Sequence, residues 1–292
     1  MSPVWKSDWK SFEEEMIYLN DFSMKHTEWG ALTALTNPFL EELGHRNDGF
    51  WDDGVSQAEP HMLFWQGEQI GFCAVEPQPE GSGMLRAFYL LPSYRFTAQA
   101  SFQAVLDACR VSSAMVPSND EFFLCLSLET MRVQGGSLDL QAYNMTYGPP
   151  RREAEYGPES FSPVSDLDEM HAQTENMWSG EPLPEDARFY KVVEHGEVLG
   201  YGSLYPRRLD QEYLDVGNYV LPSHREKGVG RSILIQLSRK VLAEGKKPSA
   251  GCWYYNHRSI RTLISSGFLP NSRIFLVHFT SRNTGTSSGV QL

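Results

Sequence analysis

The sequence predicts an α/β fold in which one mixed-sheet unit occurs twice, and three observations support this prediction. Two phrases recur in the same order, each copy alternates strand patterns with a helix pattern, and a segment rich in Pro, Gly and charge separates the copies. Such alternation, with a hairpin at the start, predicts a mostly antiparallel mixed β-sheet flanked by helices. We therefore expect tandem domains at 1–147 and 148–280, and a disordered tail at 281–292.

The repeat rests on two anchors. GEQIGFCAVEP at 67–77 matches GEVLGYGSLYP at 196–206, and LPSYR at 91–95 matches LPSHR at 221–225. The spacings of the two pairs differ by a single residue, as expected for a duplicated unit. A weaker third match pairs FFLCLSLE with SAGCWYYN, and it equates Glu129 with Asn256.

The second copy shows the plan of the unit most clearly. Pro222 ends a strand because proline cannot donate to the ladder, and Gly245 is a typical stop after a run of apolar residues at helical spacing. The expected elements are a hairpin at 188–206, a strand at 212–222, a helix at 228–245, a strand at 249–255, a helix at 257–265 and a strand at 273–279. Residues 147–163 are expected to form a linker or an irregular first strand.

Composition limits the class of partner. The 292 residues carry a net charge of −12, which argues against nonspecific nucleic-acid binding and against anionic membranes but is compatible with a cationic substrate. The N-terminus lacks a signal-peptide pattern, and no apolar run is long enough to span a bilayer. Four scattered cysteines are typical of reduced thiols in a cytoplasmic protein.

No metal site is expected from the sequence. The eight histidines never pair at metal-ligand spacing. The aspartates of RNDGFWDDG at 46–54 lack the Glu that closes an EF-hand loop, so this segment is interpreted as a polar loop.

The loop Arg225-Glu-Lys-Gly-Val-Gly-Arg231 follows a strand and opens a helix. The first amides of a helix have no intrahelical partners, and glycine lets a phosphate approach them, so the loop is a candidate pyrophosphate site. Neither the Rossmann fingerprint nor the Walker pattern fits, because Ile233 stands where a third glycine would be and no Gly-Lys-Ser/Thr follows. A plain strand–helix turn remains the alternative.

Downstream residues extend this pattern. The glycine loop is followed by a helix, a strand, Asn256-x-x-Ser259 and then Gly267-Phe268. In this order the motifs resemble the GCN5-related N-acetyltransferase superfamily over about 189–280. The resemblance implies a coenzyme A site, with acetyl-coenzyme A or another acyl-coenzyme A as co-substrate. The implied cofactor residues are Tyr219, Val220, Leu221, Arg225, Glu226, Lys227, Gly228, Val229, Gly230, Arg231, Asn256 and Ser259.

The implied reaction is direct attack of an amine on a thioester carbonyl. The incoming ammonium must first lose a proton to become a nucleophilic amine. The oxyanion of the tetrahedral intermediate then needs a hydrogen-bond donor, here a backbone amide near Val220, before the thiolate leaves. Asp215 is the candidate base, and Glu212 is an alternative. The non-catalytic alternative for Asp215 is a solvent-exposed charge on the strand. Many members place a Tyr seven residues after the Asn, where this chain has Leu263.

Tyr254 is therefore the candidate acid, and Tyr255 and His257 are alternatives. The non-catalytic alternative for the aromatic residues is packing in the core. A thiolate of pKa about 8.5 also leaves without an acid. Acidic residues at 181–186 would attract a cationic amine or form a solvated loop.

The first copy has Ala98 and Ala100 where the second has glycines, and we expect it to be a degenerate, non-catalytic domain that braces the second. The predicted function is an acyl-coenzyme A-dependent N-acyltransferase that acts on a primary amine of a small molecule or peptide. The alternative is a non-catalytic coenzyme A-binding sensor or scaffold. The identity of the amine, the acyl chain length and the oligomeric state are not readable from the sequence.

Overall fold

The computed structural model describes residues 21–44, 47–178 and 186–280. The first half contributes a run of five neighbouring strands to the described sheet. Its strands are β1 (Phe22–His26), β2 (Glu59–Trp65), β3 (Glu68–Pro77), β4 (Gly83–Leu90) and β5 (Val111–Pro117). Its helices are η1 (Trp29–Leu32), α2 (Thr33–Glu42), α3 (Gly49–Gln57), η2 (Pro92–Thr97), α4 (Ala98–Ala108) and α5 (Glu121–Gln134).

The second half repeats this plan after β6 (Gly136–Tyr147). Its strands are β7 (Phe161–Pro163), β8 (Arg188–Glu194), β9 (Glu197–Pro206), β10 (Tyr213–Val220), β11 (Lys247–Trp253) and β12 (Phe268–Phe279). Its helices are η3 (Pro158–Ser160), α6 (Leu167–Gln173), η4 (Pro222–His224), α7 (Val229–Ala243) and α8 (His257–Ser265). No helix in the described part of the chain is long and apolar enough to cross a membrane.

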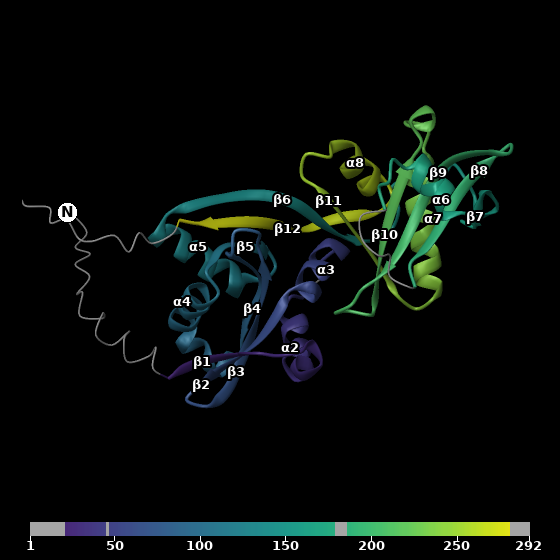
Figure 1. Cartoon of the computed structure of the whole chain (residues 1–292). Helices are drawn as coiled ribbons and strands as arrows, with labels where there is room; N and C mark the ends of the chain where they lie inside the picture. Colours follow the sequence, from purple (N-terminus) through teal and green to yellow (C-terminus); the bar gives the residue numbers. More distant parts are fainter. Residues whose placement is uncertain (1–20, 45–46, 179–185, 281–292) are drawn as a thin grey trace, which may run out of the picture.

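The described strands form one sheet in the order β1-β2-β3-β4-β5-β12-β6-β11-β10-β9-β8-β7. Neighbours are antiparallel except for β4–β5 and β10–β11, which run parallel. Figure 1 shows the sheet as two lobes joined by the long strands β6 and β12. The predicted mixed α/β class, with tandem units of mostly antiparallel sheet and flanking helices, is confirmed.

The last strand of each half lies within the other half. β12 pairs with β5 of the first half, and β6 pairs with β11 of the second half. The two strands also pair with each other along most of their length. Each half therefore completes its sheet with a strand from the other half, so the backbone hydrogen bonds of both depend on the whole chain.

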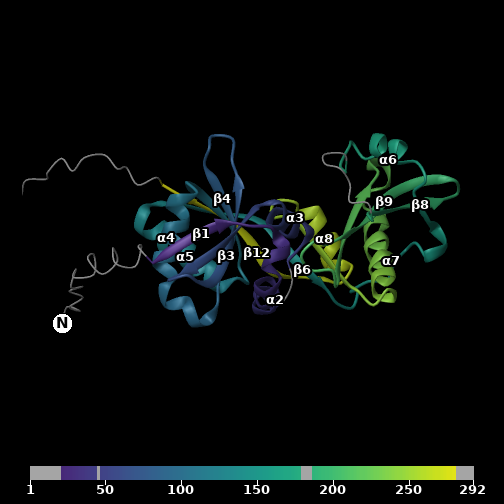
Figure 2. The same cartoon turned by 60° about the horizontal axis from the view of Figure 1, so that its bottom comes forward.

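Helices cover both faces of each lobe, as Figure 1 and Figure 2 show from two sides. In the first half, α4 and α5 enclose one core cluster with the sheet, and α2 and α3 enclose another on the opposite face. In the second half, α7 and α8 cover one face, while α6 packs on the other through Met170, Phe189 and Tyr201. This arrangement leaves α3 of the first half against β11 of the second half.

Two sequence-based interpretations are wrong. The segment at 46–54 is not a polar loop, because most of it forms α3, whose N-cap Asp48 accepts a hydrogen bond from the Trp51 amide. The third repeat match is also wrong, because 122–129 lies in α5 rather than in a strand. Phe123, Leu126 and Thr130 are buried at helical spacing, which a strand would divide between two faces.

Other boundaries differ only slightly. α8 covers the expected residues 257–265, and Gly245 adopts a positive φ of 74° directly after the C-cap of α7. β12 begins at Phe268 rather than at 273. Residues 148–160 have no strand, and β7 pairs with β8 as a short edge strand. The predicted disordered tail lies outside the described residues.

Candidate coenzyme A site

A cleft of about 790 Å³ opens where β10 ends and α7 begins. Its walls come from the end of β10, the loop before α7 and the first turns of α8. Among its described lining residues, Glu226 is the one carboxylate, whereas four are arginines, so the cleft suits a ligand that carries phosphates. The arginines are Arg225, Arg231, Arg258 and Arg261.

The loop that enters α7 has the backbone that an anion site needs. Gly228 is the N-cap residue and adopts the left-handed conformation, with φ 79° and ψ −2°. Without a side chain at this position, the amides of the first helical turn are accessible to an anion. Gly230 has another role: a Cβ there would lie 3.1 Å from Asn218 Nδ2 and 3.2 Å from a Thr262 methyl carbon. This glycine lets α7 approach β10 and α8 closely.

A carboxylate from the segment between the halves lies on this loop. A Cβ at Gly228 would fall 1.5 Å from Glu155 Oε2, so the Glu155 carboxylate is directly against the glycine. It also forms an ion pair with Arg231. The Glu155 amide donates to Ser232 Oγ at 2.9 Å, which fixes the segment on the first turn of α7. The carboxylate oxygens stand in for the oxygens of an anionic ligand, and the residues present therefore fit a pyrophosphate.

Most of the predicted cofactor residues lie together. Leu221 and Lys227 are not among the lining residues, and the Leu221 amide instead donates to Leu199 O at 3.1 Å. The other ten line the cleft: Tyr219, Val220, Arg225, Glu226, Gly228, Val229, Gly230, Arg231, Asn256 and Ser259. The Asn256 side chain is the N-cap of α8, because its Oδ1 accepts from the Ser259 amide at 3.1 Å.

β10 leads from this cleft into the sheet with one edge unpaired over its second half. Its parallel register with β11 extends over three positions, from Tyr213 to Asp215, although β10 continues to Val220. The antiparallel register with β9, in contrast, extends to Val220. The β10–β11 junction thus opens after Asp215, and the exposed edge of β10 is suited to accept an extended ligand as an added strand.

The predicted catalytic residues are placed differently from one another. Leu263 is buried in the second-half core, so the position of the family's Tyr serves packing here. Tyr254 is 46% exposed, does not line the cleft, and contacts the ring of Tyr255 edge-on. Asp215 lies about 10 Å along β10 from Asn218 of the cleft, given roughly 3.3 Å per residue, at the point where β10 and β11 separate.

A second cleft, of about 590 Å³, occupies the matching place in the first half. The repeat is clear in one shared contact: Arg95 Nε donates to Leu90 O, as Arg225 Nε donates to Val220 O. The lining differs in charge, since Glu42, Asp120 and Glu121 contribute carboxylates and Arg95 is paired with Glu42. Such a surface is unfavourable for phosphates.

The loops of the two halves also differ in conformation. η2 leads directly into α4, and Ala98 is right-handed helical, with φ −53° and ψ −50°. The first half therefore has no equivalent of the left-handed Gly228 at this loop. The counterpart of Asn256 is Asp120 rather than Glu129, because both residues are N-caps of the helix that follows a parallel strand. Gly135, with φ 87°, ends that helix as Gly267 ends α8.

Sequence reasoning missed several residues of the second-half site. Arg258 and Arg261 are three residues apart on α8, a spacing that places them on one helical face and was readable from the sequence. Glu155 and Asp48 had no such signal, because their positions depend on contacts between distant segments. Groups of three or more His, Cys, Asp or Glu suited to a metal are absent from the described residues.

Comparisons with known proteins agree with this geometry. Residues 29–143 match a family model described as acetyltransferase (GNAT) domain, and residues 153–268 match one described as acetyltransferase (GNAT) family. The chain is a tandem member of the GNAT superfamily. Among curated proteins, none has significant sequence similarity to this GNAT protein.

Solved GNAT structures share the fold at low sequence identity. A GNAT-family acetyltransferase from Colwellia psychrerythraea has a TM-score of 0.71 at 18% identity, covering 88% of this chain and 100% of that chain. A tandem GNAT protein from the clavulanic acid biosynthesis pathway has a TM-score of 0.60 at 13% identity, covering 88% and 98%. A GCN5-related N-acetyltransferase from Sphaerobacter thermophilus has a TM-score of 0.54 at 14% identity, covering 88% and 95%.

Proposed function

We propose that the second half binds acyl-coenzyme A, most simply acetyl-coenzyme A, and transfers the acyl group to a primary amine of a small molecule or peptide. The observation that carries this proposal is the continuity of the arginine-lined cleft with the unpaired edge of β10. A nucleotide pyrophosphate with an extended arm needs both features, a cationic helix N-terminus and a strand edge. The matching cleft of the first half has carboxylates instead, and we propose that this half is non-catalytic.

The residues divide between the parts of this ligand. The pyrophosphate would take the amides at Gly228–Gly230 and the charge of Arg231, in place of the Glu155 carboxylate. The extended arm would lie along Tyr219 to Leu221. The Arg258 and Arg261 side chains of α8 would contribute charge to phosphate binding. When bound, the thioester supplies the carbonyl that the amine attacks.

The chain's own groups then handle charge and protons. Asp215 accepts a proton from the incoming ammonium, which frees the nitrogen lone pair for attack. An amide near Val220 at the open edge of β10 stabilises the negative charge on the carbonyl oxygen. As the C–N bond forms and the C–S bond breaks, the nitrogen loses its second proton to solvent, and the thiolate takes the electron pair of the C–S bond. A thiolate of pKa about 8.5 leaves without a dedicated acid, consistent with the burial of Leu263 and with the absence of Tyr254 from the described cleft lining.

The acceptor side is the sheet face opposite α7. Leu214 and Val216 pack under α7 in the core, so Asp215 points to the other face by strand alternation. Trp178 lies 3.9 Å from where a Cβ of Gly217 would be on that face. Carboxylates and an aromatic ring favour a cationic amine. The predicted acidic residues Glu181 and Glu185 fall outside the described residues.

We also propose that the protein is cytoplasmic. None of the four cysteines forms a disulfide, which is typical of a cytoplasmic protein. The net charge of −12 favours partners other than nucleic acid or anionic membranes.

A non-catalytic coenzyme A-binding module is the second candidate, because Leu263 replaces the usual acid and Tyr254 does not line the cleft. The test is thiol release from acetyl-coenzyme A with a broad panel of primary amines, alongside calorimetric titration of coenzyme A. We expect binding and amine-dependent thiol release. Binding without turnover on any amine would favour the module, and absence of binding would refute both functions.

A further inference from the structure

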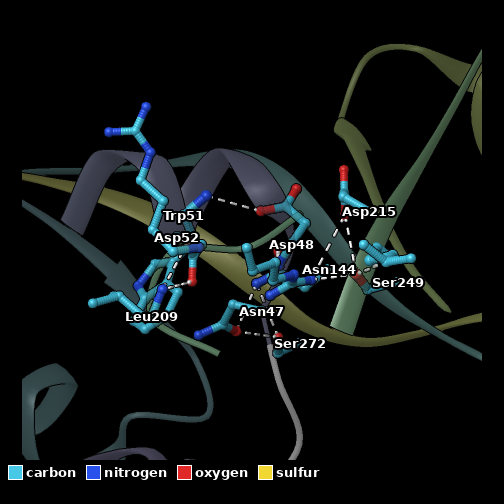
Figure 3. Close-up of polar contacts among 12 residues, drawn as sticks. Asn47, Asp48, Trp51, Asp52, Asn144, Leu209, Asp215, Ser249 and Ser272 are labelled. Carbon is cyan, nitrogen blue, oxygen red and sulfur yellow. Dashed lines mark hydrogen bonds and ion pairs between the residues drawn. The ribbon is translucent and has the colours of Figure 1, made fainter. Parts of the chain in front are cut away.

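A polar cluster joins the two halves at the β10–β11 junction. It is formed by α3 of the first half, β10 and β11 of the second, and the two exchanged strands, and Figure 3 shows its members facing one another. Two of its carboxylates, Asp48 and Asp215, come from different halves. The proposed reaction uses only Asp215, so the role of Asp48 is open.

The exchanged strands fix the position of Asp48. The Asp48 amide donates to Asn144 Oδ1 of β6 at 3.1 Å. Asn144 Nδ2 donates to Asn47 Oδ1 at 2.8 Å, and Ser272 of β12 contacts the same oxygen at 3.2 Å. The start of α3 is thereby held against the strands that link the halves. Asp48 itself is only 4% exposed.

The carboxylate of Asp48 reaches the second half because β11 has a glycine beneath it. A Cβ at Gly251 would lie 1.6 Å from Asp48 Oδ2, so any larger residue would displace the carboxylate. One carboxylate oxygen, Oδ1, accepts from the Trp51 amide at 3.0 Å as the N-cap of α3. The other oxygen faces the sheet on the side where Asp215 lies.

Asp215 is the more accessible member of the pair. Its side chain is 23% exposed, and Oδ1 accepts from Ser249 Oγ at 3.1 Å. The amide of Gly49, the residue after Asp48, also hydrogen-bonds to it. Arg207 Nη2 lies 3.6 Å from Oδ1. The exposed carboxylate is therefore at the open end of the junction, and Asp48 lies behind it.

Some groups around the pair raise the pKa values of its carboxyls, and others lower them. Burial, and then the charge of Asp215, raise the pKa of Asp48 to about 7. Burial also raises the pKa of Asp215, while Arg207 opposes this effect. The other described titratable or charged groups around the pair are Asp52, Asp53, Tyr205, Arg208 and Cys252. One buried cation near two carboxylates leaves an excess of negative charge, so the pair favours retaining a proton.

We propose that Asp48 is a positioning residue that acts through Asp215: when both carboxylates are ionised, their repulsion lets Asp215 accept one proton from the acceptor ammonium near neutral pH, and the pair then shares that proton. This inference rests on the proposed acyl transfer. An isolated aspartate ionises near pH 4 and is too weak a base for an ammonium. The second negative charge makes the fully ionised pair a stronger base, and the proton that it accepts relieves the cost of burying both charges. A residue of the first half would thus raise the basicity of the catalytic carboxylate in the second half.

Asp48→Asn tests this role because asparagine is an equally good N-cap and keeps the shape of the side chain. Loss of the charge lets Asp215 ionise more easily. The acid limb of the pH profile of kcat/KM should therefore move to lower pH by about one unit. A merely structural role would leave the limb in place. Above neutral pH the variant should be at least as stable as the unmodified protein, because burial raises the pKa of Asp48, so its ionised carboxylate destabilises the fold there, and asparagine carries no such charge.

Asp120→Asn is the matched control. Asp120 is also a buried N-cap, accepts from the Phe123 amide, and has a pKa raised by burial to about 7, but it lines the cleft of the first half. Its substitution should leave the acid limb unmoved. An unshifted limb in active Asp48→Asn, or an equal shift in Asp120→Asn, would overturn the proposal while leaving acyl transfer intact.

A second measurement needs neither turnover nor a folded Asp48→Asn variant. The ¹³C shifts of the aspartate carboxyls report each titration directly. The measurement uses the Asp120→Asn background because the pKa of Asp120 is also raised to about 7. We expect an Asp carboxyl that titrates near neutrality and moves to lower pH in Asp215→Asn. A titration that does not respond to Asp215→Asn would show that the carboxylates are not coupled and would refute the inference, whatever the assay of acyl transfer shows.

Discussion

At the scale of single residues, the site depends on which side chains are absent. Gly228 leaves room for an anion on the first turn of α7, and Gly251 leaves room for the Asp48 carboxylate on β11. At the first of these positions the protein itself provides the anion, through Glu155. A bound pyrophosphate and Glu155 cannot occupy the same amides, so the affinity for coenzyme A includes the displacement of this carboxylate.

Glu155→Gln is therefore expected to bind coenzyme A about two- to fivefold more tightly, since an ion pair whose carboxylate is half-exposed, as in Glu155–Arg231, is worth roughly 0.5–1 kcal/mol. Calorimetric titration measures this change. Glu153→Gln is the matched control, because the Glu153 side chain pairs with Arg239 at 3.7 Å on the exposed side of α7. Weaker binding by Glu155→Gln would show that the carboxylate assists the ligand instead of competing with it.

At the scale of elements, the turn that opens the long helix distinguishes the two copies. Both turns follow a strand that ends at Leu-Pro and open a helix, and both hold an arginine on a backbone carbonyl. Ala98 continues the helical path, whereas Gly228 reverses the sign of φ before α7 begins. The same topology thus provides an open helix N-terminus in the second half and a continuous helical turn in the first.

Gly228→Leu should abolish coenzyme A binding without unfolding the protein, because the side chain would cover the first-turn amides and meet the Glu155 carboxylate. A left-handed leucine costs about 1–2 kcal/mol by itself. Gly245→Leu is the control for this strain, since Gly245 ends the same helix at φ 74° with open space around it. Both variants should lose similar thermal stability, and only the first should lose affinity.

The same titration reports the state of the first half. We expect one coenzyme A per chain in the unmodified protein, because the first-half cleft is lined by carboxylates. Two per chain would contradict the proposal that this half is degenerate, and unchanged affinity in Gly228→Leu would contradict the pyrophosphate assignment.

At the scale of the whole molecule, the two copies are not independent folding units. β12 completes the first half and β6 the second, and the pair crosses between the lobes (Figure 1). Removing either strand would expose unpaired backbone groups in both halves. The position of α3 on β11, and with it the Asp48–Asp215 pair, also depends on this exchange.

Thermal unfolding is therefore expected to be a single transition, in which circular dichroism and hydrogen exchange of β3 and α7 report the same stability. A chain truncated after Gly267, which lacks β12, should lose protection in both halves. A chain truncated after Thr280 keeps β12 whole and should keep the transition. Independent unfolding of the two halves would show that the exchanged strands contribute little.

The sequence by itself determined the repeat, the class of fold and the glycine loop. These follow from local patterns: helical spacing defines α7, proline ends β10, and glycine is required where φ is positive. The same local information led to wrong interpretations of two helical segments. Short α3, with two glycines and three aspartates around it, has the composition of a loop, and α5 was matched to a strand by a weak alignment.

Only the tertiary structure decided how the copies are joined and which carboxylates meet. Strand exchange leaves no signal in local periodicity, because β6 and β12 have the same pattern whichever half they complete. The contacts of Glu155 with Gly228 and of Asp48 with Gly251 link segments far apart in the chain. Charges and burial at such places are set by packing across the molecule, so a sequence specifies them only through its complete fold.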